Sequence, residues 1–430
     1  MNLAAHPLAA TLDADALRDL VMEAGADDMG FVSIGDPALD DQRAEILSVF
    51  PFARTLLSFV VRMNRENIRS PARSFANLEF HQSNDACDTT ARAIVRALEA
   101  RGRRAGYPPV GFPMEADNWP GKLWVISHKP IAVAAGLGQM GLHRNVIHPR
   151  FGSFILLGTV AVDLNVAHDG APLDHNPCME CKLCVAACPT GAIAPDGHFD
   201  FAACYTHNYR EFMGGFSDFI ETVAEAKNAR DYRRKVEDQE TVSMWQSLSY
   251  RPNYKAAYCL AVCPAGEDVI GPYLSSKKAF LEGVVDPLKR KVETIYVRRG
   301  SDAETYVLRR FPHKRAKRVG AVLRPATVDG FLGALRHIFQ RNASAGLSAT
   351  YHFTFTGASR RQATVAIADR KLRVSDGLVG AADLAVTADA DTWIRFLRKE
   401  ASLPWALISR RIRMSGDPRL LAAFGRCFPS

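Results

Sequence analysis

Seven of the nine cysteines lie within residues 178–263, and their spacing constrains this chain more than any other feature. The pattern C-x2-C-x2-C-x3-C-P is formed by Cys178, Cys181, Cys184, Cys188 and Pro189. Two-residue spacers let one tight loop present three thiolates to the corners of a cubane cluster, and the fourth cysteine then ligates a neighbouring cluster. Four-cysteine zinc sites more often show two separated pairs. The spacing therefore predicts iron–sulfur clusters.

A second, shorter cysteine set follows, and it predicts a second cluster. By pseudo-symmetry we expect one 4Fe-4S cluster to be held by Cys178, Cys181, Cys184 and Cys263. The other cluster is then expected on Cys188, Cys204 and Cys259.

The second cluster is one cysteine short, because Ala256 stands where its fourth ligand would be. It is therefore expected to be a 3Fe-4S cluster, or a 4Fe-4S cluster with a non-cysteine ligand or an open iron. The candidates for the missing ligand are His207, Asn253, Tyr258 and Cys87.

Length and composition indicate a soluble protein of several domains. A chain of 430 residues exceeds the size of one hydrophobic core, so two or three domains are expected. Residues 1–13 lack the charge and apolar core of an export signal, and the longest apolar stretch, residues 153–164, is too short for a membrane span. Crowded cysteines in a reducing compartment usually bind metal. We therefore expect a cytoplasmic protein without an integral membrane segment.

Patterning divides the chain into four parts. In residues 1–165, apolar runs at 29–34, 55–61 and 153–162 read as strands among helices, which predicts an α/β domain. Residues 166–285 form the cysteine-rich module. In residues 325–430, apolar and polar residues alternate with period two and two capped helices follow, which predicts a small α+β domain.

The connector between the last two parts, residues 286–324, is strongly basic. Its first 35 residues hold eleven Lys or Arg and four acids. Such a segment serves as an RNA surface, as an anionic-lipid surface or as a dock for an acidic electron donor. A solvated linker has the same composition, so the sequence leaves these alternatives open.

A glycine motif, G-x-G-x-x-G, is formed by Gly136, Gly138 and Gly141. A dinucleotide-binding fingerprint needs a strand before it and a helix after it. Residues 130–135 instead look helical, and residues 142–150 make a poor helix. We therefore favour a loop whose backbone approaches a large planar cofactor.

Several segments resemble one known family. His128-Lys129-Pro130, the glycine motif, Phe151-Gly152 and the cysteine motif are similar to epoxyqueuosine reductases and their relatives, the reductive dehalogenases, over residues 10–290. The resemblance implies a nitroreductase-like N-terminal domain that binds cobalamin and a two-cluster ferredoxin-like module. Three positions depart from the family pattern: Lys122 where an aspartate proton donor is expected, Gln139-Met140-Gly141-Leu142 at the end of the glycine motif, and Ala256.

The C-terminal part resembles a second family. Residues 351–355, residues 383–386 and the segment Arg413-Met414-Ser415-Gly416-Asp417 are similar to the sterol-carrier-protein type-two family. The resemblance implies a domain that encloses an apolar tunnel for lipids or sterols.

These features together predict a reductase. Electrons would pass singly from a ferredoxin or flavodoxin through both clusters to a hydrophobic substrate, with cobalamin held at Gly136, Gly138, Gly141 and His143 and with His128 as the catalytic proton donor. The alternative is an electron-transfer or lipid-binding adaptor without chemistry of its own. A tRNA-modifying epoxyqueuosine reductase has the weakest support from the sequence, so tRNA is not expected as a partner.

Overall fold

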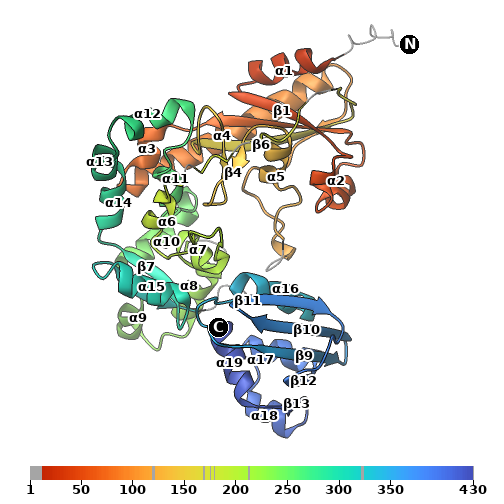
Figure 1. Ribbon diagram of the computed structural model, residues 1–430, viewed down its shortest axis with the longest axis vertical. Helices are drawn as coiled ribbons and strands as arrows, with labels where there is room; N and C mark the ends of the chain where they lie inside the picture. The colour runs from red at the N-terminus through yellow and green to blue at the C-terminus, as the bar shows by residue number, and fades with distance from the viewer. Residues whose placement is uncertain are drawn as a thin grey trace.

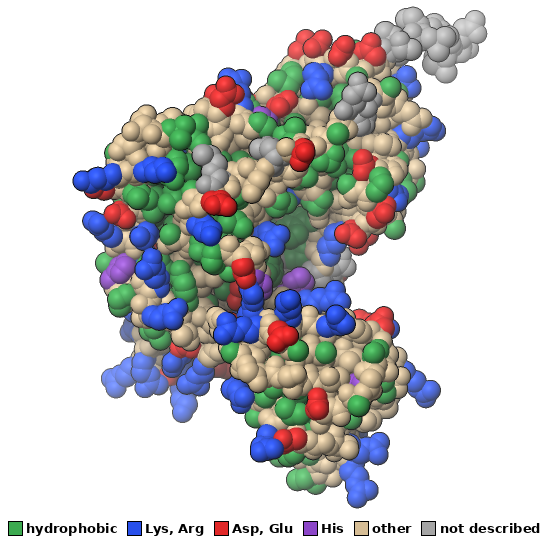
Figure 2. Space-filling view, in the orientation of Figure 1, with side chains coloured by type: hydrophobic (Ala, Val, Ile, Leu, Met, Phe, Trp, Pro, Cys, Tyr) green, Lys and Arg blue, Asp and Glu red, His purple; other side chains and the backbone are tan. Residues whose placement is uncertain are grey.

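The computed structural model describes residues 12–118, 122–167, 170–174, 176–178, 180–211, 214–320 and 324–429. An N-terminal domain, a helical cysteine-rich module and a C-terminal domain follow one another along the chain (Figure 1). Figure 2 shows a hollow between the N-terminal and C-terminal domains, in which apolar side chains lie recessed and Lys, Arg and His side chains gather at the edge.

The N-terminal domain is built on an antiparallel sheet with the strand order β1-β2-β6-β3. The central strand β2 (Thr55–Arg62) is buried along its length except for Arg62, because helices cover both faces of the sheet. The flanking strands are β1 (Asp28–Ser33), β6 (Ile155–Val162) and the two-residue β3 (Ala105–Gly106). The mixed α/β character predicted for this domain is confirmed; its nitroreductase-like layout stays a prediction.

Two pairs of helices bury the two faces of this sheet. Helices α1 (Ala14–Glu23) and α4 (Arg73–Glu99) pack on Phe59 and its neighbours. Helices α2 (Arg43–Val49) and α5 (His128–Ala134) pack on the opposite face. The remaining elements are η1 (Pro37–Leu39), α3 (Arg65–Arg69), η2 (Ala116–Asn118), β4 (Gln139–Met140) and β5 (Val146–Ile147).

The cysteine-rich module is helical. Its elements are α6 (Leu183–Ala187), α7 (Phe201–Asn208), α8 (Gly214–Ala224), α9 (Ala229–Lys235), α10 (Asp238–Tyr250), α11 (Tyr258–Ala261), α12 (Glu267–Ser275), α13 (Lys277–Phe280), η3 (Leu281–Val285) and α14 (Asp286–Arg290). Helices α8, α9 and α10 form a unit of their own around Phe219, Val236 and Met244.

The basic connector is folded rather than extended. Strands β7 (Thr294–Arg298) and β8 (Arg315–Val319) pair in parallel, and α15 (Asp302–Arg310) joins them. Many of its cations are paired with acids: Lys314 with Glu293, Arg315 with Glu237, Lys317 with Glu240, and Arg318 with Glu304. Glu237 and Glu240 belong to the module, so Arg315 and Lys317 pair the folded connector with it, and the connector is not a free linker.

The C-terminal domain has a five-stranded sheet with the order β11-β10-β9-β12-β13, in which only β9 and β12 run parallel. The strands are β9 (Ala349–Thr356), β10 (Arg361–Ala368), β11 (Lys371–Asp376), β12 (Leu384–Asp389) and β13 (Ile412–Gly416). The helices are α16 (Val328–Ile338), α17 (Ala390–Leu397), α18 (Leu403–Ile408) and α19 (Arg419–Cys427). The predicted α+β class is observed.

Candidate iron–sulfur centre

Two short helices carry the paired cysteines in the same way. Helix α6 follows Lys182, and α11 follows Ala257; both preceding residues adopt the left-handed conformation, with φ of 51° and 55°. Each helix bears a cysteine in its first turn, Cys184 or Cys259, and ends before a second cysteine four residues later. The pseudo-symmetry expected from the sequence is thus visible in the backbone, and the two helices contact each other.

The first group contains Cys178, Cys181 and Cys184 of the cysteine motif and Cys263, which lies after helix α11. Cys184 and Cys263 are both buried, and each interacts electrostatically with Cys178 and Cys181. The backbone N–H of Leu142 donates to Cys178 Sγ at 3.3 Å, so the turn after the glycine motif borders this group.

The second group contains Cys188, Cys204 and Cys259. Cys204 and Cys259 each interact with the other and with Cys188. All three lie in one apolar cluster with Leu142 and Ala203, and Cys184 of the first group belongs to the same cluster. Cys184 also interacts with Cys259, so the two groups are neighbours. The structure therefore brings the seven cysteines into one neighbourhood, while their division into two sets and their role as ligands stay predictions.

The thiol chemistry fits iron–sulfur clusters. All nine cysteines are free thiols, so no disulfide competes for them. Burial raises the pKa of the Cys204 thiol to about 12 and that of Cys263 to about 11. Thiolates in these positions need a positive partner, which iron would supply. Within the described ranges, no three His, Cys, Asp or Glu side chains are set around the position of a single metal ion.

The four sequence candidates for the missing ligand have other partners. Tyr258 donates its hydroxyl to Glu293 Oε2 at 2.7 Å, and Asn253 donates to Ser247 Oγ at 3.5 Å. His207 Nδ1 accepts the backbone N–H of Tyr296, and Cys87 lies on α4 and is buried in the core of the N-terminal domain. The Nε2 atom of His207 is buried without a partner in the described structure.

Two residues that the sequence did not single out for this role adjoin the second group. Lys129 and Tyr209 both interact electrostatically with Cys204 and Cys259. Tyr209 follows Cys204 by five residues, at the C-cap of α7, so nearness along the chain was the available signal. Lys129 lies 75 residues before Cys204, and only the fold brings the two together.

The three glycines of the motif lie close to other parts of the same chain. Gly136 has φ of 76°, and a Cβ there would lie 2.8 Å from the Ala171 carbonyl oxygen. At Gly138 the nearest atom would be the Ile147 carbonyl oxygen at 2.4 Å, and at Gly141 the Ile147 side chain at 2.7 Å. These glycines are therefore explained by close contacts within the chain, and they do not form an open cradle for a corrinoid. Helix α5 precedes the glycines and a turn follows them, whereas a dinucleotide-binding fingerprint needs a strand before and a helix after.

His128 and His143, the two histidines predicted to act near this loop, both form hydrogen bonds within the protein. His128 Nδ1 contacts Thr159 Oγ1 at 2.8 Å, and its Nε2 contacts the Pro109 carbonyl oxygen at 3.3 Å. Burial lowers the pKa of His128 and lowers that of His143 to about 4. His143 accepts the Asn145 N–H at Nδ1, and its Nε2 is buried without a partner in the described structure. The catalytic role of His128 and the cofactor role of His143 stay predictions.

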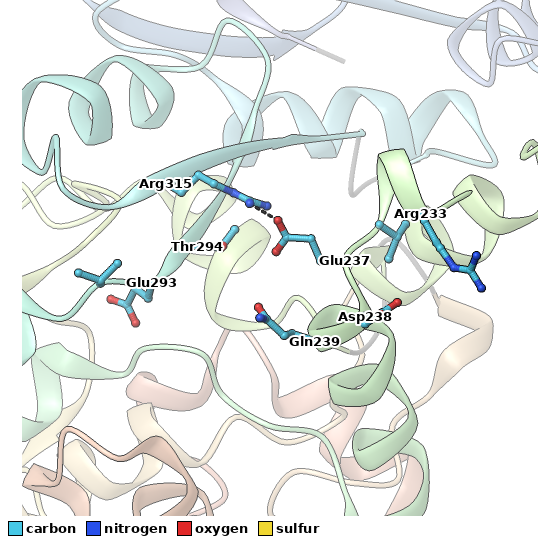
Figure 3. A pocket seen from close by; sticks show the side chains of 9 residues that line it. Arg233, Glu237, Asp238, Gln239, Glu293, Thr294 and Arg315 are labelled. Carbon is cyan, nitrogen blue, oxygen red and sulfur yellow. Dashed lines mark hydrogen bonds and ion pairs between the residues drawn. The ribbon is translucent and has the colours of Figure 1, made fainter. Parts of the chain in front are cut away.

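A cavity is lined by residues other than the cysteines and histidines considered above. It has a volume of about 660 Å³ and lies where α9 and α10 meet the connector. Figure 3 shows Arg315 turned toward Glu237 across this cavity, with Arg233, Asp238 and Gln239 around it. Its lining therefore mixes both signs of charge, and none of the described residues that line it is a cysteine.

Comparison with known proteins agrees with these features. Residues 171–194 match the 4Fe-4S binding domain family, and residues 334–429 match the SCP-2 sterol transfer family. The epoxyqueuosine reductase of Vibrio cholerae serotype O1 is 34% identical over 117 residues, which are 27% of this chain and 28% of the relative. That of Cyclobacterium marinum is 38% identical over 76 residues, 18% of this chain and 24% of the relative.

This chain resembles the epoxyqueuosine reductases. The resemblance predicted from the sequence is confirmed for both families, although the chain spans only about a quarter to a third of the length of the curated relatives it matches.

Solved structures add fold neighbours with low similarity scores. Epoxyqueuosine reductase from Streptococcus thermophilus has a TM-score of 0.34 and 16% identity, covering 64% of this chain and 78% of that one. The reductive dehalogenase NpRdhA has a TM-score of 0.35 and 14% identity, covering 45% and 29%. Palmitated SCP2L2 from Aedes aegypti has a TM-score of 0.21 and 18% identity, covering 24% and 91%. In the described part of the chain, no helix has the length and apolarity of a membrane span.

Proposed function

We propose that this protein is a reductase in which two iron–sulfur clusters deliver single electrons to a substrate. The observation that carries the proposal is the meeting of seven free thiols from three separate segments, residues 178–188, helix α7 and residues 259–263. The clusters would supply one-electron transfer, and the protein would hold them with Cys178, Cys181, Cys184 and Cys263 on one side and Cys188, Cys204 and Cys259 on the other. A ferredoxin or flavodoxin would be the electron donor.

The names of the relatives support an enzyme over an adaptor, because the curated relatives are reductases. The SCP-2 match supports a hydrophobic substrate or lipid as the partner of the C-terminal domain. The proposal involves no corrinoid, because the glycines that would cradle it lie against other parts of the chain.

The decisive experiment is metal analysis of the anaerobically purified full chain, with iron, sulfide and cobalt measured together. Two clusters require about seven or eight irons per chain, since each cubane holds three or four. Cys181→Ala and Cys188→Ala variants should each lose the signal of one cluster in electron paramagnetic resonance (EPR) spectra and keep that of the other. About four irons in the parent protein would contradict the proposal.

A second candidate is modification of tRNA, which the names of the curated relatives favour and which revises the expectation that tRNA is not a partner. One solved neighbour, with a TM-score of 0.36, is an epoxyqueuosine reductase with a tRNA stem loop. Deletion of the gene followed by analysis of tRNA nucleosides tests this candidate. Accumulation of epoxyqueuosine, reversed by the parent gene and not by the Cys188→Ala variant, would establish it; an unchanged nucleoside profile would exclude it.

A further inference from the structure

Helix α18 has apolar side chains on two sides, one toward the core of the C-terminal domain and one toward solvent. Ala406 is buried, and Leu403 and Leu407 pack against that core. Trp405 and Ile408 are instead 51% and 83% exposed. Residues three apart on a helix lie on the same face, so these two side chains form one exposed apolar pair. Single exposed apolar residues are common, so the surroundings of this pair decide what it means.

Cations flank the apolar pair on both sides along the chain. Residues 395–413 contain six Lys or Arg and a single acid, Glu400. The Arg411 guanidinium lies 5.7 Å from the centre of the Trp405 ring. The ion pairs of this segment are long, Arg395 with Asp391 at 3.9 Å and Arg411 with Asp389 at 3.8 Å. Within the described residues, the other four cations form no ion pair; they are Arg398, Lys399, Arg410 and Arg413.

The position of α18 leaves this surface accessible. Figure 1 shows the helix at the end of the C-terminal domain that lies away from the N-terminal domain, and its principal contact is with β13. Strand β13 forms one edge of the sheet, and β11 forms the opposite edge.

The combination of charges and apolar side chains fits an anionic lipid bilayer. The lipid phosphates of such a bilayer attract Lys and Arg, and its interface takes up Trp and other apolar side chains. A nucleic acid would account for the cations but would leave Ile408 without an apolar partner.

We propose that α18 docks the protein on the surface of an anionic lipid bilayer. Trp405 and Ile408 would enter the interface, and the cations around them would face the lipid phosphates. The docked protein would then lie where apolar molecules dissolve. The inference goes beyond the proposed function and needs neither cluster, so vesicle binding and the iron count can fail separately.

The test is flotation of the full chain with lipid vesicles at low salt. The parent protein should float with vesicles made of equal parts of phosphatidylglycerol and phosphatidylcholine, and much less with vesicles of phosphatidylcholine alone. Binding should weaken as salt is added, because salt screens the attraction between the cations and the lipid phosphates. Equal binding to both kinds of vesicle, or no binding to the anionic ones, would overturn the inference.

Matched variants separate this surface from the rest of the domain. Ile408→Gln should weaken binding about tenfold, because it removes a large apolar side chain from the interface. Arg410→Gln should weaken it about fivefold, the effect of one cation near an anionic bilayer. Val379→Gln and Arg373→Gln are the controls, since both side chains are exposed but lie in or just after β11, and they should change nothing. If the controls weaken binding equally, or if only Arg410→Gln weakens it, the inference is wrong.

Fluorescence quenching measures whether α18 enters the bilayer. Anionic lipids that carry bromine on their acyl chains should quench part of the tryptophan emission of the parent protein. Trp405→Phe keeps the other tryptophans and should lose this quenching. Quenching that persists in Trp405→Phe would mean that another surface enters the bilayer, and it would overturn the assignment to α18.

Discussion

Glu293 is a buried carboxylate whose neighbours decide whether it stays ionised. Burial acts to raise its pKa, but Lys314, His207 and the Tyr258 hydroxyl more than offset burial, and the pKa ends below its ordinary value. Lys314 lies 2.7 Å away with its side chain 1% exposed. The pair ties the connector to the cysteine-bearing helix α11 through Tyr258. Its contribution to stability is present at neutral pH and is lost as the pH falls through the lowered pKa.

Lys314→Met tests this pair. The variant leaves a buried carboxylate short of its main partner, so the free energy of unfolding should fall by about 3 kcal/mol near neutral pH. The deficit should shrink below about pH 4.5, the ordinary pKa of a glutamate, because Glu293 then takes up a proton. Urea unfolding between about pH 4 and pH 8 measures both effects. Lys291→Met, at a side chain 29% exposed, is the control and should cost much less.

Ala256 allows a second test at the scale of one residue. It occupies the position in the second set that Cys181 occupies in the first, and it is buried beside α11. Ala256→Cys should complete the second ligand set, so less iron should be lost from the second cluster during brief oxidation in air. Iron released to a chelator measures this loss. Ala279→Cys adds a thiol on the surface and should change nothing; equal protection by both would refute the assignment.

At the scale of elements, two turns lock the N-terminal domain against the module through glycine. A Cβ on Gly152, whose φ is 63°, would lie 2.0 Å from the Ala265 carbonyl oxygen. Gly266 faces the same turn, and a Cβ there would lie 2.4 Å from the Gly152 nitrogen. The backbone N–H of Glu267 donates to the Pro149 carbonyl oxygen at 2.9 Å. The segment that carries Cys263 is therefore positioned by backbone contact.

Gly152→Ala should force these turns apart. We expect a loss of at least about 2 kcal/mol in unfolding free energy, from left-handed strain and the clash together, and a faster loss of iron from the first cluster. Gly102→Ala is the matched control, since Gly102 also has a positive φ of 72° but no atom within 4 Å of the added Cβ. Chemical unfolding and iron release on dilution into chelator distinguish them. Equal effects would mean that only backbone strain is involved.

Elements with strong local signals were predictable, and those fixed by distant contacts were not. The strand at 55–62 was recognisable from its unbroken apolar run, and Asp389 caps α17 as its sequence position suggests. The sequence predicts a helix only over residues 84–101, whereas α4 begins at Arg73, because its first turns bury Arg73 and Asn77 as well as apolar residues. The spacing alone predicted that the seven cysteines lie together, whereas the contact of Leu142 N–H with Cys178 Sγ depends on the fold of the turn at 142–145.

At the scale of the whole molecule, the C-terminal domain meets the module through α16 and α7, where His337 contacts the ring of Phe201, and through polar contacts. The Asp302 carboxylate accepts the backbone N–H groups of Asn342 and Ala343 at 2.7 and 3.2 Å. Arg341 pairs with Asp196 of the module at 2.8 Å. The domain has its own aromatic core, centred on Phe331, Phe353 and Trp393. Such an interface favours two units that unfold separately once the contacts are removed.

Asp302→Ala should therefore loosen the domain without unfolding it. We expect limited proteolysis between the connector and α16 to become faster and the calorimetric transition of the C-terminal domain to separate from that of the rest. Asp376→Ala removes an exposed ion pair with Arg361 inside the domain and should leave both readouts unchanged. If both variants behave alike, Asp302 does not join the two parts.

The first thiol group draws its members from the two ends of the module, Cys178 and Cys263. A cluster bound there closes a chain segment of more than eighty residues, which includes α7 to α11, in the way that a cross-link closes a loop. Ribosomal synthesis must therefore pass residue 263 before the metal can be fully held. Maturation of the protein is then ordered in time, with cluster insertion following the completion of this segment and fixing its fold.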